Sequence, residues 1–255
     1  MKNLFDVSGK VAVVTGGSRG IGAMIARGFV ENGVKTYITA RKEQELQATQ
    51  QSLAALGQCI AIPSDLSTVA GVTAFATAVM AAEDRVHILV NNAGATWGAD
   101  IDEFPESGWD KTMDLNVKAM FFLIQQLLPA LRAAGTEEDP ARVINIGSIN
   151  GLTHPHMKNY AYSASKAAVH HLTRHLGADL ARERINVNGI APGFFPSKMT
   201  AHLLAHEAEM AATFPRGRLG NAEDAAGTAI YLSARASAWL TGHTIVLDGG
   251  AVALA

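Results

Sequence analysis

Residues 10–22 read KVAVVTGGSRGIG, and this stretch decides the fold that we expect. The apolar run Val11–Val14 has the β-branched composition of a buried strand, and a helical pattern follows over Ile21–Glu31. The glycines between them stand where the chain must turn from a strand into a helix. A strand, a glycine-rich turn and a helix in this order predict the first unit of an open α/β sheet.

The same alternation of strand and helix patterns continues toward the C-terminus. Further strands are expected at Lys35–Ala40, Gln58–Ile62, Val86–Asn91, Arg142–Gly147, Asn186–Ile190 and Thr244–Leu247. Helices are expected at Glu43–Leu56, Val69–Glu83, Gly108–Ala134, Tyr160–Ala181 and Glu223–Leu232. Most of the strands are too apolar to have a face in water, so the pattern predicts a doubly wound α/β fold with a parallel sheet of seven strands. Pro129 lies inside the longest helical pattern, and we expect the last turns of that helix to be irregular.

The composition is that of an ordinary globular protein and excludes several classes. The 255 residues are 48% hydrophobic and 17% charged, with a formal net charge of −2, so no broad positive field favours nucleic acid as a partner. The N-terminus lacks the apolar stretch of a signal peptide, and no window reaches the roughly 18 apolar residues of a membrane span. Cys59 is the single cysteine and cannot form an internal disulfide. We therefore expect a cytoplasmic protein without a membrane partner.

The glycine turn and the second strand predict a nucleotide site. Backbone amides at a helix N-terminus bind a pyrophosphate, although a tight turn without a ligand is the alternative interpretation. A site for NAD usually has an acidic residue after the second strand, about 20 residues beyond the glycines, but this chain has Arg41 followed by Lys42. Arg41 can bind a 2′-phosphate with paired hydrogen bonds, and Arg19 can approach it from the turn. We expect NADP(H) as the cofactor, the alternative being that Arg41 and Lys42 only begin a solvated helix.

Tyr162 and Lys166 are the candidates for the chemistry. A spacing of four residues puts the phenol and the ammonium on one face of a predicted helix. A nearby cation favours the phenolate and lowers the pKa of a tyrosine, and we expect the ammonium and a positively charged nicotinamide to bring that pKa near 7 together. Tyr162 would then act as an acid or a base. Ser148, at the end of a strand, supplies a hydroxyl that can hold a substrate oxygen.

At this point the chain resembles the short-chain dehydrogenase/reductase family, from Gly9 to Gly250. The family's motifs occur together and in order: TGGSRGIG at 15–22, Asp65-Leu66, Asn91-Asn92-Ala93-Gly94, Asn116, Ser148, Tyr162 with Lys166, and Pro192-Gly193. Within the family the chain looks like the classical branch, nearest to the 3-oxoacyl reductases and the rhamnolipid-associated β-ketoacyl reductase type. The resemblance implies a Rossmann fold, with residues 1–255 forming a single NADP-binding domain. It also implies reversible reduction of a ketone or 3-oxoacyl-type carbonyl to a secondary alcohol.

The resemblance also implies which residues form the site. The catalytic set would be Asn116, Ser148, Tyr162 and Lys166, with Asn116 holding a water that passes protons from Lys166 to solvent. The cofactor would contact Gly16, Ser18, Arg19, Ile21, Arg41, Asp65, Leu66, Asn92, Ala93, Gly94, Tyr162, Lys166, Pro192, Gly193, Phe195 and Ser197. The family often has Thr where Ser197 stands, and Pro196 removes a backbone donor there. A homotetramer built partly on the helices near 108–134 and 160–181 is implied as well.

Two irregular segments, 149–159 and 194–216, follow predicted strands, and we expect the second to be a substrate lid. The substrate would contact Trp97, Ile149, Met157, Phe194, Leu203 and Leu204, an apolar lining that favours an aliphatic or aromatic small molecule over a free sugar. Acidic residues at 137–139 favour free ketones or coenzyme A esters over an acidic carrier protein. The resemblance implies the same preference, because Gly177-Ala178-Asp179 lacks the basic residue that the resembling 3-oxoacyl reductases have there.

Alternative interpretations remain beside this one. The same fold serves non-catalytic nucleotide sensors and scaffolds, against which the intact Ser148, Tyr162 and Lys166 argue. Sugar-nucleotide epimerases and dehydratases resemble the family too, but generally carry a longer C-terminal substrate domain. His171 with His175, and His202 with His206, have the spacing of metal-binding pairs, yet no further ligand completes either set, and we expect no metal. Cys59 is expected to be a small core residue.

Overall fold

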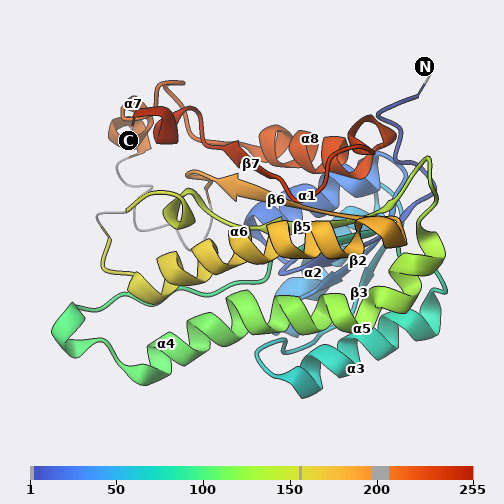
Figure 1. Cartoon of the computed structure of the whole chain (residues 1–255), viewed down its shortest axis with the longest axis horizontal. Helices are drawn as coiled ribbons and strands as arrows, with labels where there is room; N and C mark the ends of the chain where they lie inside the picture. Colours follow the sequence, from blue (N-terminus) through green and yellow to red (C-terminus); the bar gives the residue numbers. More distant parts are fainter. Residues whose placement is uncertain (1–2, 155–156, 197–206, 255) are drawn as a thin grey trace.

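The strand that opens the sequence motif lies in the middle of the sheet. In the computed structural model, which describes residues 3–154, 157–196 and 207–254, β1 (Val11–Thr15) pairs in parallel with β2 on one side and β4 on the other. The sheet has seven parallel strands in the order β3-β2-β1-β4-β5-β6-β7 (Figure 1). The other strands are β2 (Lys35–Thr39), β3 (Cys59–Ala61), β4 (Ile88–Asn91), β5 (Ala141–Ile146), β6 (Ile185–Pro192) and β7 (Thr244–Leu247). The predicted doubly wound α/β fold, in a single domain, is confirmed.

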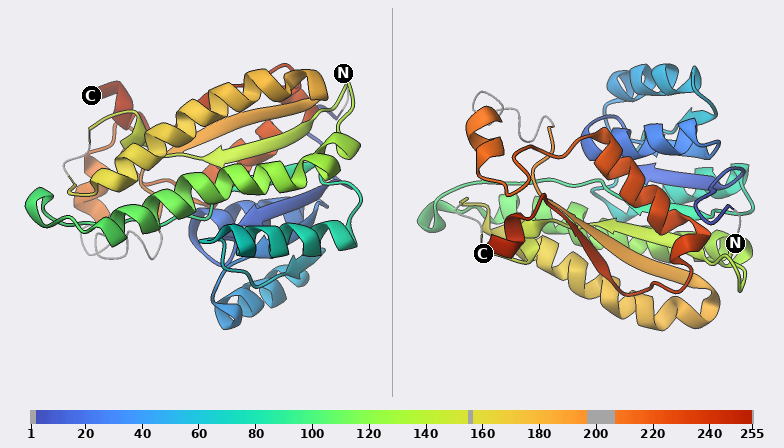
Figure 2. Two further views of the ribbon diagram at one scale, coloured as in Figure 1. Left: turned by 60° about the horizontal axis from the view of Figure 1, so that its bottom comes forward. Right: turned by 90° about the horizontal axis from the view of Figure 1, so that it is seen from above.

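Helices cover both faces of this sheet (Figure 2). They are α1 (Gly20–Glu31), α2 (Glu43–Ala54), α3 (Val69–Ala82), α4 (Glu106–Met113), α5 (Ala119–Ala134), α6 (Tyr160–Leu180), α7 (Glu207–Ala212) and α8 (Ala222–Ser233). Short 3₁₀ turns occur at Ile101–Glu103, Ile149–Gly151, Ala181–Glu183, Arg235–Ser237 and Ala251–Leu254. The chain order of the strands reverses at β1, and ligands of such sheets bind beyond the carboxyl ends of the strands at that point.

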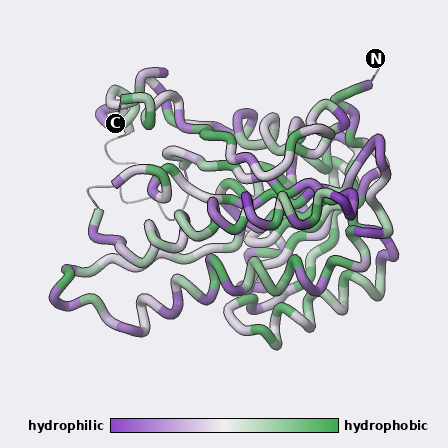
Figure 3. Tube along the Cα trace, in the orientation of Figure 1, coloured by the Kyte–Doolittle hydropathy of each residue, from purple (hydrophilic) through white to green (hydrophobic). Residues whose placement is uncertain are grey.

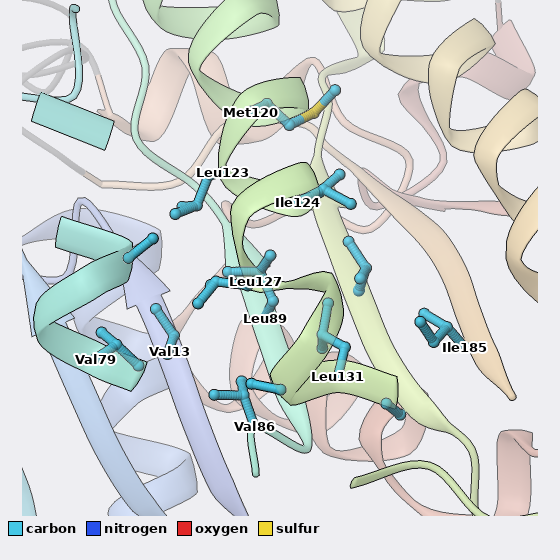
Figure 4. Packing of buried hydrophobic residues seen from close by; sticks show 14 of the residues in the cluster. Val13, Val79, Val86, Leu89, Met120, Leu123, Ile124, Leu127, Leu131 and Ile185 are labelled. Carbon is cyan, nitrogen blue, oxygen red and sulfur yellow. The ribbon is translucent and has the colours of Figure 1, made fainter. Parts of the chain in front are cut away.

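Two hydrophobic cores lie on opposite faces of the sheet because successive side chains of a strand point in opposite directions. Val11 and Val13 of β1 join the core beneath α3, α5 and α6, whereas Ala12 and Val14 join the core beneath α1, α2 and α8. Figure 4 shows the first core, where side chains of α5 such as Leu127 meet β1 and β4. Burial on both faces explains the continuous apolar runs of the strands, which are visible as green segments in the interior of Figure 3.

The long helix expected at 108–134 is divided, and its irregular part is not where we expected it. A π-helical turn, Asp114–Lys118, separates α4 from α5. Pro129 lies inside α5, which continues without a break to Ala134, so the prediction of irregular last turns was wrong. A π turn widens the backbone at one point and often occurs at functional sites, and this one contains Asn116.

The segment Glu106–Ala134 is the one helical stretch among the described residues that is long and apolar enough to cross a membrane by length and composition. Its most apolar window has a mean hydropathy of 1.2, and 44% of that window is buried inside the protein. Its buried side packs on α3 and the sheet. A core helix meets the same criterion, so the stretch is weak evidence for a membrane span.

A buried charge cluster ties the amino end of the sheet to the end of α8. Asp139 lies 2.7 Å from the ammonium of Lys10 and 3.1 Å from the guanidinium of Arg142, which is 1% exposed. The two cations also donate to the carbonyls of Ser233 and Ala234 at the C-terminal end of α8, where a helix favours positive charge. Burial lowers the pKa values of both cations, against which the carboxylate of Asp139 acts.

We predict that Asp139→Asn destabilises the protein by about 3 kcal/mol, because it removes the carboxylate from between two buried cations. The change keeps the side-chain shape, so packing is preserved. The midpoint and slope of a urea unfolding curve give the free energy of unfolding. Glu138→Gln, at the exposed neighbouring position, is the matched control and should change that free energy by less than about 0.5 kcal/mol. Equal stability of the two variants would contradict the prediction.

Candidate active site

A cleft of about 490 Å³ opens at the carboxyl ends of the central strands. Most of the residues expected to form the site line it: Gly16, Ser18, Arg19, Ile21, Arg41, Leu66, Asn92, Ala93, Gly94, Ser148, Tyr162, Lys166, Pro192, Gly193 and Phe195. Sequence reasoning assigned no role to other residues of the lining, among them Thr39, Ala40, Glu45, Ser64, Thr96 and Lys111. These lie one or two positions from recognised motifs or on the facing helices, where no motif spacing identifies them.

The glycine turn is held tightly against the loop after β4. Gly16 has a φ of +65°, and a Cβ there would lie 2.8 Å from the side-chain nitrogen of Asn92. That side chain donates to the carbonyls of Thr15 and Gly16, and the Thr15 hydroxyl accepts from the N–H groups of Asn92 and Ala93. Only glycine fits such a close approach without strain. The loops after β1 and β4 therefore form one wall, in which Thr15 is a residue that sequence reasoning left without a role.

One end of the cleft is lined by positive charge. Arg19 lies 2.8 Å from the carboxylate of Glu45, and Lys42 lies 3.3 Å from the other oxygen of that carboxylate. Arg41 has no ion-pair partner within 4 Å in the part of the chain that the structure describes. Asp65 does not line the cleft; the N–H of Ser67, and to a smaller extent the charge of Arg41, hold the pKa of its carboxyl below the usual value. This end has the charge that attracts a phosphate.

The other end of the cleft brings together the hydroxyl, phenol and ammonium groups expected from the sequence. Tyr162 and Lys166 occupy successive turns of α6, with the ammonium nitrogen 5.5 Å from the centre of the phenol ring. The ammonium donates to the carbonyl of Ile146 at 2.7 Å. Ser148 follows β5, forms a hydrogen bond with Tyr162, and accepts from the N–H of Asn150 at 3.1 Å. A carbonyl bound here would meet two hydroxyl groups at once.

Asn116 lies in the π turn, and its side chain is fully engaged with protein groups. Its carbonyl oxygen accepts from the N–H of Ala95 at 2.8 Å, and its amide donates to the carbonyl of Ala95 and to the Ser165 hydroxyl. Ser165 is the residue before Lys166 on α6. Asn116 therefore joins the loop after β4 to the helix that carries Tyr162 and Lys166, while its expected role in holding a water stays a prediction.

Burial changes the pKa values of Tyr162 and Lys166 in the protein without a bound cofactor. It raises the pKa of Tyr162, and the hydrogen bond from Ser148 opposes this only in part. Burial also lowers the pKa of Lys166 to about 8. The lowered pKa expected for Tyr162 is therefore not a property of these side chains by themselves, because desolvation of the phenolate outweighs the hydrogen bond from Ser148.

None of the residues expected to contact the substrate lines the cleft in the described part of the chain, Trp97 and Phe194 included. Trp97 packs against α4, where a Cβ on Gly108 would lie 2.6 Å from its ring, and the ammonium of Lys111 lies over it at 5.1 Å. Phe194 packs edge-on against Phe214. Ile149 is half-buried and Met157 is 43% exposed, and neither lines the cleft. Ser197, Leu203 and Leu204 lie outside the described residues, as does much of the lid expected at 194–216.

The candidate metal ligands and the cysteine form no site in the described part of the chain. No group of three or more His, Cys, Asp or Glu side chains there has the arrangement of a metal site. His175 lies 3.5 Å from Asp179 on the exposed side of α6, and His202 and His206 fall outside the described residues. Cys59 is buried, and burial raises the pKa of its thiol to about 11, which suits a core residue.

Comparison with known proteins places the chain beside enzymes of one kind. A family model described as short chain dehydrogenase matches residues 10–208. The rhamnolipids biosynthesis 3-oxoacyl-[acyl-carrier-protein] reductase of Pseudomonas aeruginosa is 49% identical over 254 residues, covering 98% of this chain and 99% of that protein. The gluconate 5-dehydrogenase of Gluconobacter oxydans is 33% identical, covering 97% of this chain and 96% of that protein. The solved NADP complex of Pseudomonas aeruginosa RhlG superposes with a TM-score of 0.95 at 48% identity, covering 98% of this chain and 99% of that one.

Proposed function

The chain belongs to the short-chain dehydrogenase family, and we propose that it reduces a 3-oxoacyl-type or related ketone to a secondary alcohol with NADPH. The observation that carries this proposal is the meeting of Ser148, Tyr162 and Lys166 at one end of a cleft whose other end holds Arg19 and Arg41. Neither this arrangement nor the relatives support a non-catalytic sensor. Membership of this family confirms the Rossmann-fold oxidoreductase that the sequence predicted.

The residues present fit NADPH. Gly16 lets the glycine turn pack directly against Asn92 and Ala93, and the first turn of α1 that follows offers backbone amides to a dinucleotide phosphate. The buried hydroxyl of Thr39 lines the cationic end without a hydrogen-bond partner among the described residues. Arg19 and Arg41 would hold the 2′-phosphate, and the loop after β4 would line the nicotinamide end. When bound, NADPH supplies the hydride that the carbonyl carbon accepts.

The chain's own residues supply the proton and hold the oxygen. Tyr162 donates its phenolic proton to the carbonyl oxygen, and the hydroxyl of Ser148 holds that oxygen in place. The ammonium of Lys166, 5.5 Å from the phenol ring centre, stabilises the phenolate that remains. Asn116 keeps α6 at a fixed distance from the loop after β4 through Ser165 and Ala95. The alcohol leaves, and the phenolate regains a proton from solvent.

We predict that kcat/KM for NADPH, which reports ionisations of the free enzyme, falls about tenfold per pH unit above about pH 8. The reason is that Lys166 has a pKa of about 8 and is needed as the ammonium form. The lowered pKa of Lys166 changes the free energy of unfolding in the opposite direction, so that stability rises where activity falls. Because the unfolded state keeps the proton up to about pH 10.4, the contribution of Lys166 to the free energy of unfolding increases between pH 8 and 10.4.

Steady-state rates and urea unfolding of the wild type and of Lys166→Met, measured from pH 7 to 10, check both signs. The stability difference between the two proteins should move in favour of the wild type as the pH rises, while the activity of the wild type falls. A flat kcat/KM to pH 10 would show that Lys166 does not titrate in this range.

The charge argument against an acidic carrier does not hold in the fold. The turn at 137–139 precedes β5 and lies at the amino end of the sheet, opposite the cleft, with Asp139 paired to Lys10 and Arg142. Asp179 stands near the far end of α6, about 25 Å along the helix from Tyr162 at 1.5 Å per residue. Neither residue lies where a carrier would approach the cleft. These acidic residues therefore give no reason to prefer free or coenzyme A-linked substrates, and that preference stays a prediction.

The experiment that tests the proposed function is a rate comparison with one acyl group in several forms. NADPH oxidation is followed with a 3-oxoacyl ester that is free, coenzyme A-linked or carrier-linked, and with 5-ketogluconate, since one relative is a gluconate 5-dehydrogenase. We expect turnover of 3-oxoacyl compounds to exceed that of the sugar acid at least about tenfold. No oxidation of NADPH with any carbonyl compound would overturn the proposal.

We also propose that the protein is a cytoplasmic homotetramer. Two separate surfaces expose large apolar side chains. On one, Trp239 is fully exposed in the segment that precedes the edge strand β7, and Val246 of that strand is 41% exposed. On the other, Trp109, Phe121 and Tyr160 are exposed on α4, α5 and α6. A tetramer with three two-fold axes uses two different self-complementary surfaces, which matches this arrangement.

Light scattering after size-exclusion chromatography tests the tetramer. Trp239→Asp and Phe121→Asp should each reduce the assembly from four copies to two, and the double variant should be a monomer. A wild-type protein that elutes as a monomer would contradict the proposal.

A further inference from the structure

His170 lies directly beneath the loop that carries Ser148. It stands one turn after Lys166 and two turns after Tyr162 on the same face of α6. Its Nε2 lies 2.9 Å from the main-chain carbonyl oxygen of Ser148. The helix that supplies the phenol and the ammonium therefore also contacts the backbone of the serine.

The imidazole is enclosed by the backbone on both sides of Ser148. A Cβ on Gly147 would lie 2.2 Å from the ring carbon Cε1 of His170, and a Cβ on Gly151 would lie 2.8 Å from its Cδ2. Glycine at both positions allows the ring to approach this closely. Any movement of the ring would therefore displace the backbone at each end of the short turn that begins with Ser148.

The contact defines the tautomer of neutral His170. Burial lowers the pKa of the imidazole and outweighs the hydrogen bond to the Ser148 carbonyl, which raises it. The charges of Lys166 and Arg174 act with burial, so the neutral ring is favoured near pH 7. A carbonyl oxygen accepts only, which requires Nε2 to carry the proton. Nδ1 is then an acceptor, and it is buried without a partner in the described part of the chain. Such an orphan costs about 1–3 kcal/mol, a cost that an apolar side chain at this position would avoid.

We propose that His170 is a positioning residue for carbonyl reduction. By donating from Nε2 to the Ser148 carbonyl, it holds the turn in which the Ser148 hydroxyl accepts from the N–H of Asn150. That hydroxyl bonds Tyr162 and is the group that would hold the substrate oxygen. The inference deepens the proposed function and rests on it, because the alignment concerns the carbonyl that Tyr162 protonates. Misplacement of about 1 Å in such a group costs up to about a hundredfold in rate.

Two variants of equal length separate the hydrogen bond from the packing. His170→Gln keeps an N–H donor near the position of Nε2, whereas His170→Met fills similar space without a donor. We expect His170→Met to lower kcat at least about tenfold, with the affinity for NADPH and the melting temperature close to those of His170→Gln. His170→Gln should keep kcat within about threefold of the wild type. The same pair of changes at His171, the exposed neighbour, is the control and should leave kcat unchanged.

A merely structural role would lower stability and rate together and would not be rescued by glutamine. Equal kcat in the glutamine and methionine variants would overturn the proposal, as would a loss of NADPH affinity equal to the loss in kcat. If His170→Met does not fold, the comparison of His170→Gln with His170→Asn, whose donor reaches less far, replaces it. A kcat of the asparagine variant equal to that of the glutamine variant then contradicts the inference.

A measurement without substrate distinguishes failure of this inference from failure of the proposed function. Nitrogen-15 spectra of histidine-labelled protein report which ring nitrogen carries the proton. The expected result near pH 7 is a neutral His170 with the proton on Nε2. A proton on Nδ1 overturns the inference even in an active enzyme, whereas an enzyme inactive on every carbonyl overturns the proposed function and leaves the hydrogen bond to be judged by the spectrum.

Discussion

Tyr162→Phe is expected to lower kcat for carbonyl reduction by about a thousandfold while leaving NADPH bound. The change removes only the phenolic hydroxyl, so the ring keeps its place on α6 beside Lys166. What is lost is the proton donor within reach of the carbonyl oxygen and the hydrogen bond to Ser148. General acid catalysis by a positioned side chain contributes about 10²–10⁴ in rate, and among the described residues no other phenol lines the cleft.

Tyr160→Phe is the matched control for this variant. Tyr160 begins the same helix two residues earlier, is 41% exposed, and packs edge-on against Phe104 instead of facing Ser148. Its loss of a hydroxyl should change kcat by less than about twofold. NADPH binding, followed by fluorescence, should be the same in both variants. A Tyr162→Phe protein with the turnover of the wild type would mean that another group donates the proton, or that the chain acts as a nucleotide sensor.

The raised pKa of Tyr162 makes its role as an acid easier to understand. A phenol that titrates above its ordinary range is fully protonated at pH 7 and ready to donate in the direction of reduction. The oxidation direction needs the phenolate, which burial opposes. The hydrogen bond from Ser148 stabilises the phenolate in part, and the ammonium of Lys166 can add to this, so the lowered pKa of Lys166 limits the reaction from the alkaline side.

The fold was predictable because each strand is buried on both faces. All seven expected strands lie within two residues of the observed bounds, since continuous apolar runs are what a covered parallel sheet requires. The division of the long helix was not predictable in the same way. Pro129 lies in a regular helix, whereas the π turn around Asn116 contains no proline or glycine from which it could be predicted. It depends on the contacts of Asn116 with Ala95 and Ser165, which only the fold brings together.

The site residues also fall into those that sequence motifs identify and those that only contacts in the fold identify. Residues recognised by motif, such as Gly16, Ser148 and Lys166, gather in the cleft because each stands at the end of a strand or the start of a helix. His170 was missed because its partner is a main-chain carbonyl, and a backbone acceptor leaves no signal in the sequence. Trp97 was expected at the substrate, which stays a prediction; its ring fills the space over Gly108, a contact that the sequence pattern did not indicate.

Arg41→Asp is expected to change the preference of the enzyme from NADPH toward NADH by at least about a hundredfold in the ratio of kcat/KM values. Arg41 stands just after β2 at the cationic end of the cleft. Hydrogen bonds to a charged partner contribute about 1.5–3 kcal/mol, or roughly tenfold to a hundredfold in affinity. The new carboxylate would also repel a 2′-phosphate and accept hydrogen bonds from the free ribose hydroxyls of NADH, so both effects act in one direction.

The neighbouring charges explain why this position, and not the net charge, should decide the preference. Arg19 and Lys42 already share the carboxylate of Glu45, so part of their charge is neutralised before a phosphate arrives, whereas Arg41 has no ion pair in the described chain. Arg27→Asp is the matched control, because Arg27 is exposed on α1 and pairs with Glu31 within its own helix. That variant carries the same change in net charge and should keep the wild-type ratio. Unchanged kcat/KM for NADPH in Arg41→Asp would place the 2′-phosphate on other residues, Arg19 first among them.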